Sequence, residues 1–269
     1  MNMKHLKKLT MTLALAFAGV LASWAQDEYV TVNPTANANE WTFTMPGYDV
    51  ELEVEYETAL ALNEVDDNTA KLAEWNGYEA DVTLTRTLAA GSWNTLAVPF
   101  NVSATTIAMV NASLAPNSIA IKKLTSSSFE NGTLTLNFED ANEIEAGTPY
   151  LVKVPTAFSF AATPLAGIIM SNATVPTTTT YVDFIPTLGK TTIEGDDATS
   201  VLFLAAENTL KNPDKMPTDM KGFRGYFLLK GDAIGAARSF SLNLVGTPVS
   251  QHSAPLAPRK VFQFCAKTS

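Results

Sequence analysis

The chain has little cysteine and little histidine, and this scarcity removes several kinds of chemistry. Its single cysteine, Cys265, cannot form an intramolecular disulfide. Its two histidines are His5, near the N-terminus, and His252, in the C-terminal tail. The region between them therefore has no imidazole for Ser-His-Asp or Cys-His catalysis or for a His-based zinc site. A body of roughly 200 residues must then be held together by burial and hydrogen bonding, and it is long enough for that.

Long hydrophobic runs are also scarce. Residues 1–25 carry three lysines among the first eight residues and an apolar run at residues 13–21. The small residues Ser23 and Ala25 lie at the end of this segment. The alternative to a signal peptide is a membrane-anchoring helix, but the run is well short of the roughly 20 residues that cross a bilayer. We therefore predict a signal peptide that is cleaved after Ala25, and an exported protein.

Positive charge is sparse in the body of the chain. All 27 acidic residues lie between Asp27 and Asp232, and residues 27–243 contain only 12 basic residues, a net charge of −15. A phosphate backbone is bound by clustered Lys and Arg, so nucleic acid is excluded as an expected partner. A neutral or cationic partner, or simple solubility outside the cell, fits this balance better.

Alternating and continuous apolar runs predict a mainly β protein with little helix. Residues 49–57 alternate carboxylates with apolar side chains, which predicts a strand whose acidic face is either a site for a basic partner or a solvated edge. Similar alternation recurs at residues 82–88, 134–138 and 240–244. Continuous apolar runs predict strands buried on both faces at residues 96–100, 150–154, 201–206 and 226–229.

Turn-forming residues separate these runs and decide the fold class that we expect. Asn131-Gly132 predicts a tight hairpin. Many short strands with regular turns indicate an antiparallel β-sandwich or a jelly-roll-like module, preceded by a short N-terminal β segment. Only residues 60–75 have helical spacing, with Asp66, Asp67 and Asn68 as a helix cap. The same three side chains could hold calcium, but the twelve-residue loop pattern of such sites is missing.

Residues 41–52 contain a Phe-Thr-Met-Pro turn followed by an alternating strand. This stretch resembles the closing strands of the InlB B-repeat-like modules of bacterial surface proteins. Only the last part of the repeat is present, so the resemblance implies a partial β segment at residues 26–60.

Four further stretches lie at residues 81–88, 91–100, 145–153 and 222–227. Similar stretches follow one another in the same order in an uncharacterised module of exported proteins of the Bacteroides and Prevotella group, so residues 67–244 resemble that module. The resemblance implies a surface location and a β-sandwich-like module at residues 61–244, but no reaction. Such proteins usually continue into an acidic stretch, whereas residues 245–269 contain no acidic residue. A shifted reading frame, a truncated gene or a natural disordered tail would each explain this difference.

Three aromatic side chains are the candidate binding residues. Trp93 follows a Gly-Ser turn, and Trp75 and Tyr78 flank an Asn-Gly pair. Loop aromatics of this kind stack on sugar rings, although aromatic residues of strands usually pack in a core. The sequence therefore leaves both a glycan-stacking role and a core role open for them.

The function that we predict is a secreted or cell-surface module for binding or display, without catalysis, metal or cofactor, whose partner is a glycan or a host or surface protein. A structural spacer is one alternative. A glycoside hydrolase is another, because such enzymes need only two suitably spaced carboxyl groups. The nearest cluster is Asp140, Glu143 and Glu145 around a Gly-Thr-Pro turn, and its ordinary interpretation is a solvated turn.

Overall fold

The computed structural model describes residues 58–162 and 165–244, together with the backbone of residues 6–12, 33–34, 41–42 and 51–56. The chain divides into two compact units, Met1–Ala59 and Leu60–Ser269. We describe each unit by itself.

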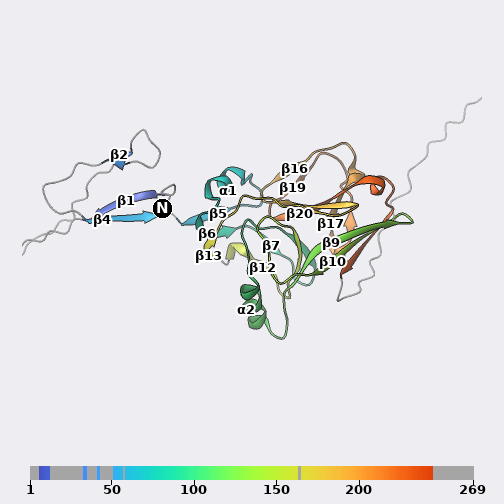
Figure 1. The fold of residues 1–269 in the computed structure, drawn as a ribbon, viewed down its shortest axis with the longest axis horizontal. Coiled ribbons are helices and arrows are strands. Elements are labelled where there is room, and N and C mark those ends of the chain that lie inside the picture. The colour runs from blue at the N-terminus through green and yellow to red at the C-terminus, as the bar shows by residue number, and fades with distance from the viewer. Residues whose placement is uncertain are drawn as a thin grey trace, which may run out of the picture. The chain divides into compact units, whose positions relative to one another are not determined.

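The described residues of the first unit form two pairs of antiparallel strands. β1 (Leu6–Thr12) pairs with β4 (Glu51–Tyr56) (Figure 1), and β2 (Asn33–Pro34) pairs with β3 (Trp41–Thr42). The strand expected at residues 49–57 is therefore observed as β4. Most of the expected signal peptide and of the partial repeat, and all of the tail at residues 245–269, lie outside the described residues, so these stay predictions.

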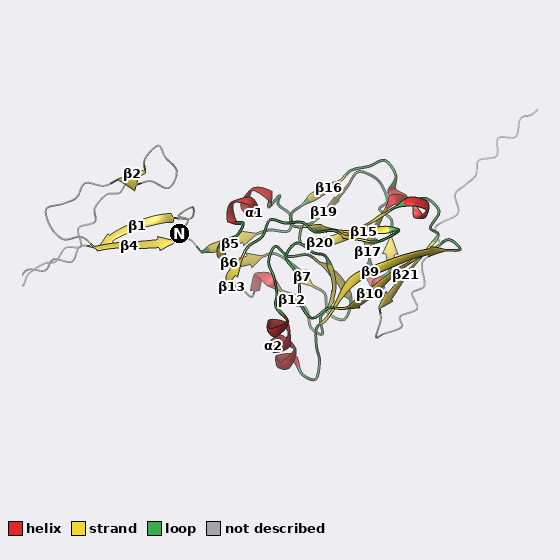
Figure 2. Ribbon diagram, viewed as in Figure 1, coloured by secondary structure: helices red, strands yellow, loops and turns green. Residues whose placement is uncertain are grey.

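Two five-stranded sheets dominate the second unit, so the expectation of a mainly β, sandwich-like module is confirmed (Figure 2). The first sheet has the order β21–β10–β9–β11–β8, with bounds Ser239–Leu244, Thr133–Asp140, Ala120–Glu130, Tyr150–Lys153 and Trp93–Leu96. The second has the order β14–β15–β20–β17–β18, with bounds Thr177–Thr178, Val182–Thr187, Arg224–Leu229, Val201–Leu204 and Leu210–Lys211.

Apolar side chains of both sheets meet in one core. Phe138 of β10 packs edge-to-face against Phe184 of β15 and Phe227 of β20, at ring-centroid distances of 6.2 and 6.3 Å. Phe184 and Phe227 stack at 4.4 Å. All three rings are fully buried, as the alternation in their strands requires of the inward-facing positions.

The expected hairpin at Asn131-Gly132 is confirmed. β9 and β10 pair antiparallel across it, and both turn residues have positive φ, 49° and 77°, as the tight primed turns demand. β21 departs from the antiparallel expectation, because it pairs parallel with β10 from Thr133↔Ser239 to Phe138↔Leu244. The strand pattern of residues 240–244 was correct, but its direction depends on where the chain returns to the sheet.

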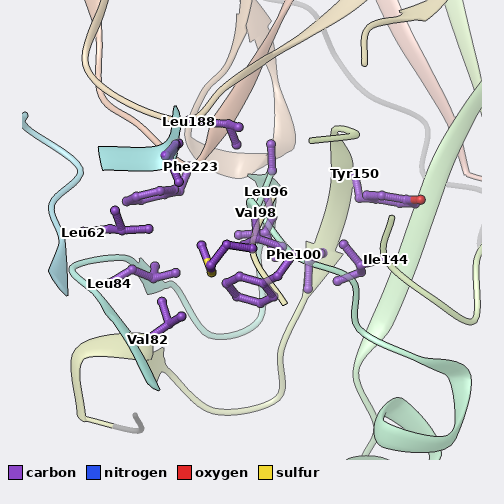
Figure 3. Packing of buried hydrophobic residues seen from close by; sticks show 14 of the residues in the cluster. Leu62, Val82, Leu84, Leu96, Val98, Phe100, Ile144, Tyr150, Leu188 and Phe223 are labelled. Atoms are coloured by element: carbon purple, nitrogen blue, oxygen red, sulfur yellow. The ribbon is translucent and has the colours of Figure 1, made fainter. Parts of the chain in front are cut away.

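A second core lies between smaller sheets and part of the first five-stranded sheet, from which it takes Leu96, Ile121 and Val152. The order β13–β6–β5 joins Leu165–Ile169, Glu79–Leu84 and Ala59–Leu62, while β7 (Thr87–Leu88) pairs with β12 (Phe158–Ser159) and β16 (Thr191–Ile193) with β19 (Thr218–Met220). Figure 3 shows Phe100 in this core between Leu84 and Ile144. Four short 3₁₀ helices complete the described part of this unit: Phe160–Ala162, Ala198–Ser200, Ala206–Asn208 and Gly231–Ala233.

The helix expected at residues 60–75 is much shorter in the structure. Residues Ala59–Leu62 form β5 with alternating burial, and α1 spans only Thr69–Trp75. Asp67 accepts hydrogen bonds from the backbone N–H and the hydroxyl of Thr69, at 2.9 and 2.5 Å. Asn68 instead donates its side-chain amide to the Leu188 carbonyl at 3.0 Å. The acidic stretch therefore does begin a helix, but tertiary pairing takes the preceding residues into a sheet.

The sequence interpretation missed α2 (Ala104–Leu114). Ser103 caps it by accepting the Thr106 N–H at 3.2 Å. The apolar run at residues 96–100 is buried as expected, but β8 ends at Leu96, and the chain bends at Pro99 and Phe100 before it reaches α2.

Candidate functional site

An apolar cavity of about 370 Å³ lies between α2 and the first five-stranded sheet. The side chains of its two main walls come from β8, β9 and β11 on one side and from α2 on the other: Leu96, Ile121, Val152, Ile107, Val110 and Leu114. Phe158 and Phe160, which pack edge-to-face at 4.8 Å, close a third side. Its volume falls at the lower end of the roughly 300–1,000 Å³ typical of ligand sites.

Polar atoms are few in this cavity. Among its lining residues only Thr106, Ser113 and Thr156 have a polar side chain, and none has a titratable one. The Thr106 hydroxyl lies 3.0 Å from the Ser103 hydroxyl, and Ser113 donates to the Val110 carbonyl at 2.7 Å. The cavity therefore suits an apolar ligand and offers no group for acid–base chemistry.

Helix α2 covers the cavity, and none of its own side chains is fully buried. Met109 is 69% exposed and Val110 is 37% exposed. Ile107 packs against the second core, and Asn111 accepts the Ile119 N–H at 2.7 Å. A helix held by so little burial is displaced at low free-energy cost, which is typical of elements that admit ligands. Figure 2 shows α2 at the periphery of the second unit.

The three predicted binding aromatics lie elsewhere. Trp93, 8% exposed, is in the core between the two five-stranded sheets, and Trp75, 5% exposed, is in the second core. Tyr78 is half-buried against that second core. Trp93 therefore belongs to a different core from Trp75 and Tyr78. Neither indole presents a face for stacking a sugar ring, so the core interpretation of both is the correct one.

Two of the three carboxylates of the alternative hydrolase site, Asp140 and Glu145, are paired with lysines. Asp140 lies 2.7 Å from Lys122, and Glu145 lies 3.0 Å from Lys123. The hydrogen bond and charge of Lys123 lower the pKa of Glu145, so this carboxyl stays ionised at neutral pH. A glycosidase general acid needs the opposite, a raised pKa.

A second, more polar hollow of about 550 Å³ lies beside α1. Its lining includes Asp67, Asn172 and Lys190, and no aromatic side chain. Asp67 is held by Thr69, whose hydrogen bonds lower its pKa, and Lys190 pairs with Asp219 at 3.0 Å. The lining mixes these polar residues with a few apolar ones such as Leu72 and Leu188, and the charges of Asp67 and Lys190 are already engaged by their neighbours. This hollow therefore offers neither a continuous apolar surface nor the aromatic side chains that line most ligand sites.

Within the described ranges, the protein is thus a β-sandwich-like module with an apolar cavity under a surface helix. No family model, no curated protein and no solved structure matches the chain. The described residues contain neither a cluster of potential metal ligands nor a helix long and apolar enough to cross a membrane.

Sequence reasoning did not find the residues of the cavity, although one signal was present. Ile107, Val110, Asn111 and Leu114 follow the i, i+3, i+4, i+7 spacing of one helix face. The intervening threonines and alanines weakened that pattern. The inner wall could not be predicted, because it assembles from strands far apart in the sequence.

Proposed function

We propose that this protein is an exported, non-catalytic binding module of a bacterial cell surface, and that its ligand enters the cavity beneath α2. The observation that carries the proposal is the cavity itself. Protein interiors are otherwise close-packed, and empty apolar volume costs stability. A purely structural spacer has no use for such a cost, whereas a binding protein recovers it when the ligand fills the space.

The chemistry of the lining supports a role without catalysis. A lining without titratable groups can bind and release a ligand, and its three hydroxyls have no general base in the lining to activate them for attack on a bond. The ion-paired carboxylates of Asp140 and Glu145 point the same way. The basic and apolar pattern of residues 1–25 supports export.

The binding proposal is tested by titrating the purified full chain with Nile red, an uncharged apolar dye whose fluorescence rises in apolar surroundings. We expect saturable binding to one site. At a dye concentration of about 100 times Kd, the free energy of unfolding should rise by about 2.7 kcal/mol. For a folded unit of about 200 residues this raises Tm by about 5–10 °C.

Two variants of α2 locate the site. In Ile107→Trp a large ring fills the cavity from its helical wall, so dye binding should disappear. In Met109→Trp the same ring is added at an exposed position outside the lining, so binding should persist. Equal binding by both variants, or no saturable binding by the unmodified chain, would contradict the proposal.

The export proposal has its own test. The full gene is expressed in a bacterium with a general secretion pathway, and the N-terminus of the protein outside the cytoplasm is sequenced. We expect it to begin at Gln26. An uncleaved chain that stays in the cytoplasm would contradict export while leaving the cavity's role unaffected.

A further inference from the structure

The lining of the cavity changes in character from its depth to its mouth. Ile121, Ile144 and Val152, at the depth, are all at most 6% exposed. The lining residues that are exposed to solvent are Val110, which is apolar, and the three that carry hydroxyls: Thr106, Ser113 and Thr156. The cavity is therefore hydrocarbon-like inside and polar where it meets water.

This gradient matches a molecule with one apolar and one polar end. A hydroxyl or amide taken into the depth would lose its hydrogen bonds to water and find no partner there, which excludes a sugar or a peptide. A charged group would be costlier still, because no lining residue carries a compensating charge. The polar end must therefore remain at the mouth, beside Thr156 and the exposed edge of α2.

The size and the walls of the cavity limit the apolar end. About 370 Å³ lies near the smallest volume used for ligands, which favours one chain over the two chains of a diacyl lipid. Most of the deep side chains are aliphatic, so they provide dispersion contacts to methylene groups without a directional requirement.

We infer that the ligand is a single-chain amphiphile whose alkyl chain lies between α2 and the face of β8, β9 and β11, with its head group left in water. The inference rests on the proposed binding function and names its ligand class. It replaces a glycan with an alkyl chain as the group that enters the protein.

The experiment measures displacement of Nile red from the full chain by 1-hexanol, 1-octanol, 1-decanol and 1-dodecanol. Each added methylene should tighten binding about four-fold until the chain fills the cavity, after which affinity levels off. Replacing 1-dodecanol by tridecanoate, which carries the same twelve-carbon alkyl chain, should change Kd by less than one methylene does, because the head group stays in water. Pyrene serves as the rigid apolar competitor.

A matched pair of charge variants tests whether the alkyl chain of the ligand lies against α2. Leu114→Asp sets a carboxylate on the half-buried helical wall of the cavity and should weaken 1-decanol binding by about ten-fold or more. Met109→Asp adds the same charge at an exposed position of the same helix, outside the lining, and should leave Kd unchanged. Neither position is fully buried, so circular dichroism should show both variants folded.

Two different failures can be told apart. Saturable dye binding without any dependence of alkanol affinity on chain length, tighter displacement by pyrene than by 1-dodecanol, or equal effects of the two aspartates would overturn the alkyl-chain inference alone. Failure of both the dye and the alkanols to bind or to raise Tm would overturn the proposed binding function with it.

Discussion

Glu64, in the connection between β5 and α1, offers the sharpest test of what holds the second unit together. Its carboxylate, 15% exposed, accepts hydrogen bonds from Lys221 at 2.9 Å and from Arg224 at 2.6 Å. Its backbone carbonyl accepts the Gly222 N–H at 2.7 Å. One residue near the start of the unit thus anchors the segment that leads into β20.

A third cation lies close to this carboxylate. Arg86 is 5% exposed and donates to the carbonyls of Thr87 and Thr95, each at 3.0 Å. Burial, and then repulsion by Arg224, lower the pKa of Arg86 to about 10, while the charge of Glu64 opposes that shift. Neutralising Glu64 would leave these cations without the carboxylate that balances them.

We predict that Glu64→Gln lowers the free energy of unfolding by about 2 kcal/mol. Removing one partner from a fully buried ion pair costs about 3–5 kcal/mol, and an exposed pair contributes only about 0–1 kcal/mol. The present pairs lie between these limits, since the Arg224 side chain is 25% exposed and that of Lys221 is 54% exposed. For a unit of about 200 residues the loss should lower Tm by about 4–8 °C, measured by calorimetry at neutral pH.

The pH dependence of this loss follows from the pKa of Glu64. Burial alone would raise that pKa, but the Lys221 hydrogen bond and the charges of Arg224, Lys221 and Arg86 bring it below the ordinary value of 4.5. Because the folded pKa is the lower one, the stabilisation is fully present above the unfolded value and is lost as the pH falls through the folded value. The Tm difference should therefore stay constant from pH 7 to about 5 and shrink below that.

The control is Glu139→Gln, which removes the same charge from an exposed position of β10. Its Tm should stay close to that of the unmodified protein, because single exposed charges contribute little. Equal Tm values for the two variants, or a Glu64→Gln difference that persists unchanged at acid pH, would refute the role assigned to Glu64.

Two further predictions concern packing. Gly147→Ala should lower the free energy of unfolding by more than about 3 kcal/mol, because φ is +71° and the new Cβ would lie 1.9 Å from the carbonyl oxygen of Ala173. Gly77→Ala, with φ of +80° and nothing within 4 Å of the new Cβ, should cost only about 1 kcal/mol, and a similar loss in both would contradict the steric explanation. Phe138→Ala should cost about 3–5 kcal/mol in urea unfolding, since it removes a ring that is fully buried between both sheets. A loss of unfolding free energy below about 1 kcal/mol would show that this core is not shared.

The candidate site was much harder to predict than the fold. Trp93 and Trp75 stood beside turn residues and so were typical of exposed binding aromatics, yet both are core side chains. A single sequence shows that a residue is near a turn, but not which side of the turn faces another sheet. The residues of the cavity carry no local sign of a binding role. Leu96, Ile121 and Val152 each look like ordinary strand residues, and they form one wall only when β8, β11 and β9 pair.

Local patterning was sufficient for the strands, because burial of one sheet face imposes a period of two on any half-buried strand. It predicted the inward positions Leu134, Leu136 and Phe138, and the Asn131-Gly132 turn that joins their strand to β9. Long-range contacts settled the rest. The parallel pairing of β21 with β10 and the placement of α2 over a sheet face join residues distant in the sequence, and no local preference encodes such pairings. The cavity, and with it the proposed function, therefore belongs to the assembled structure.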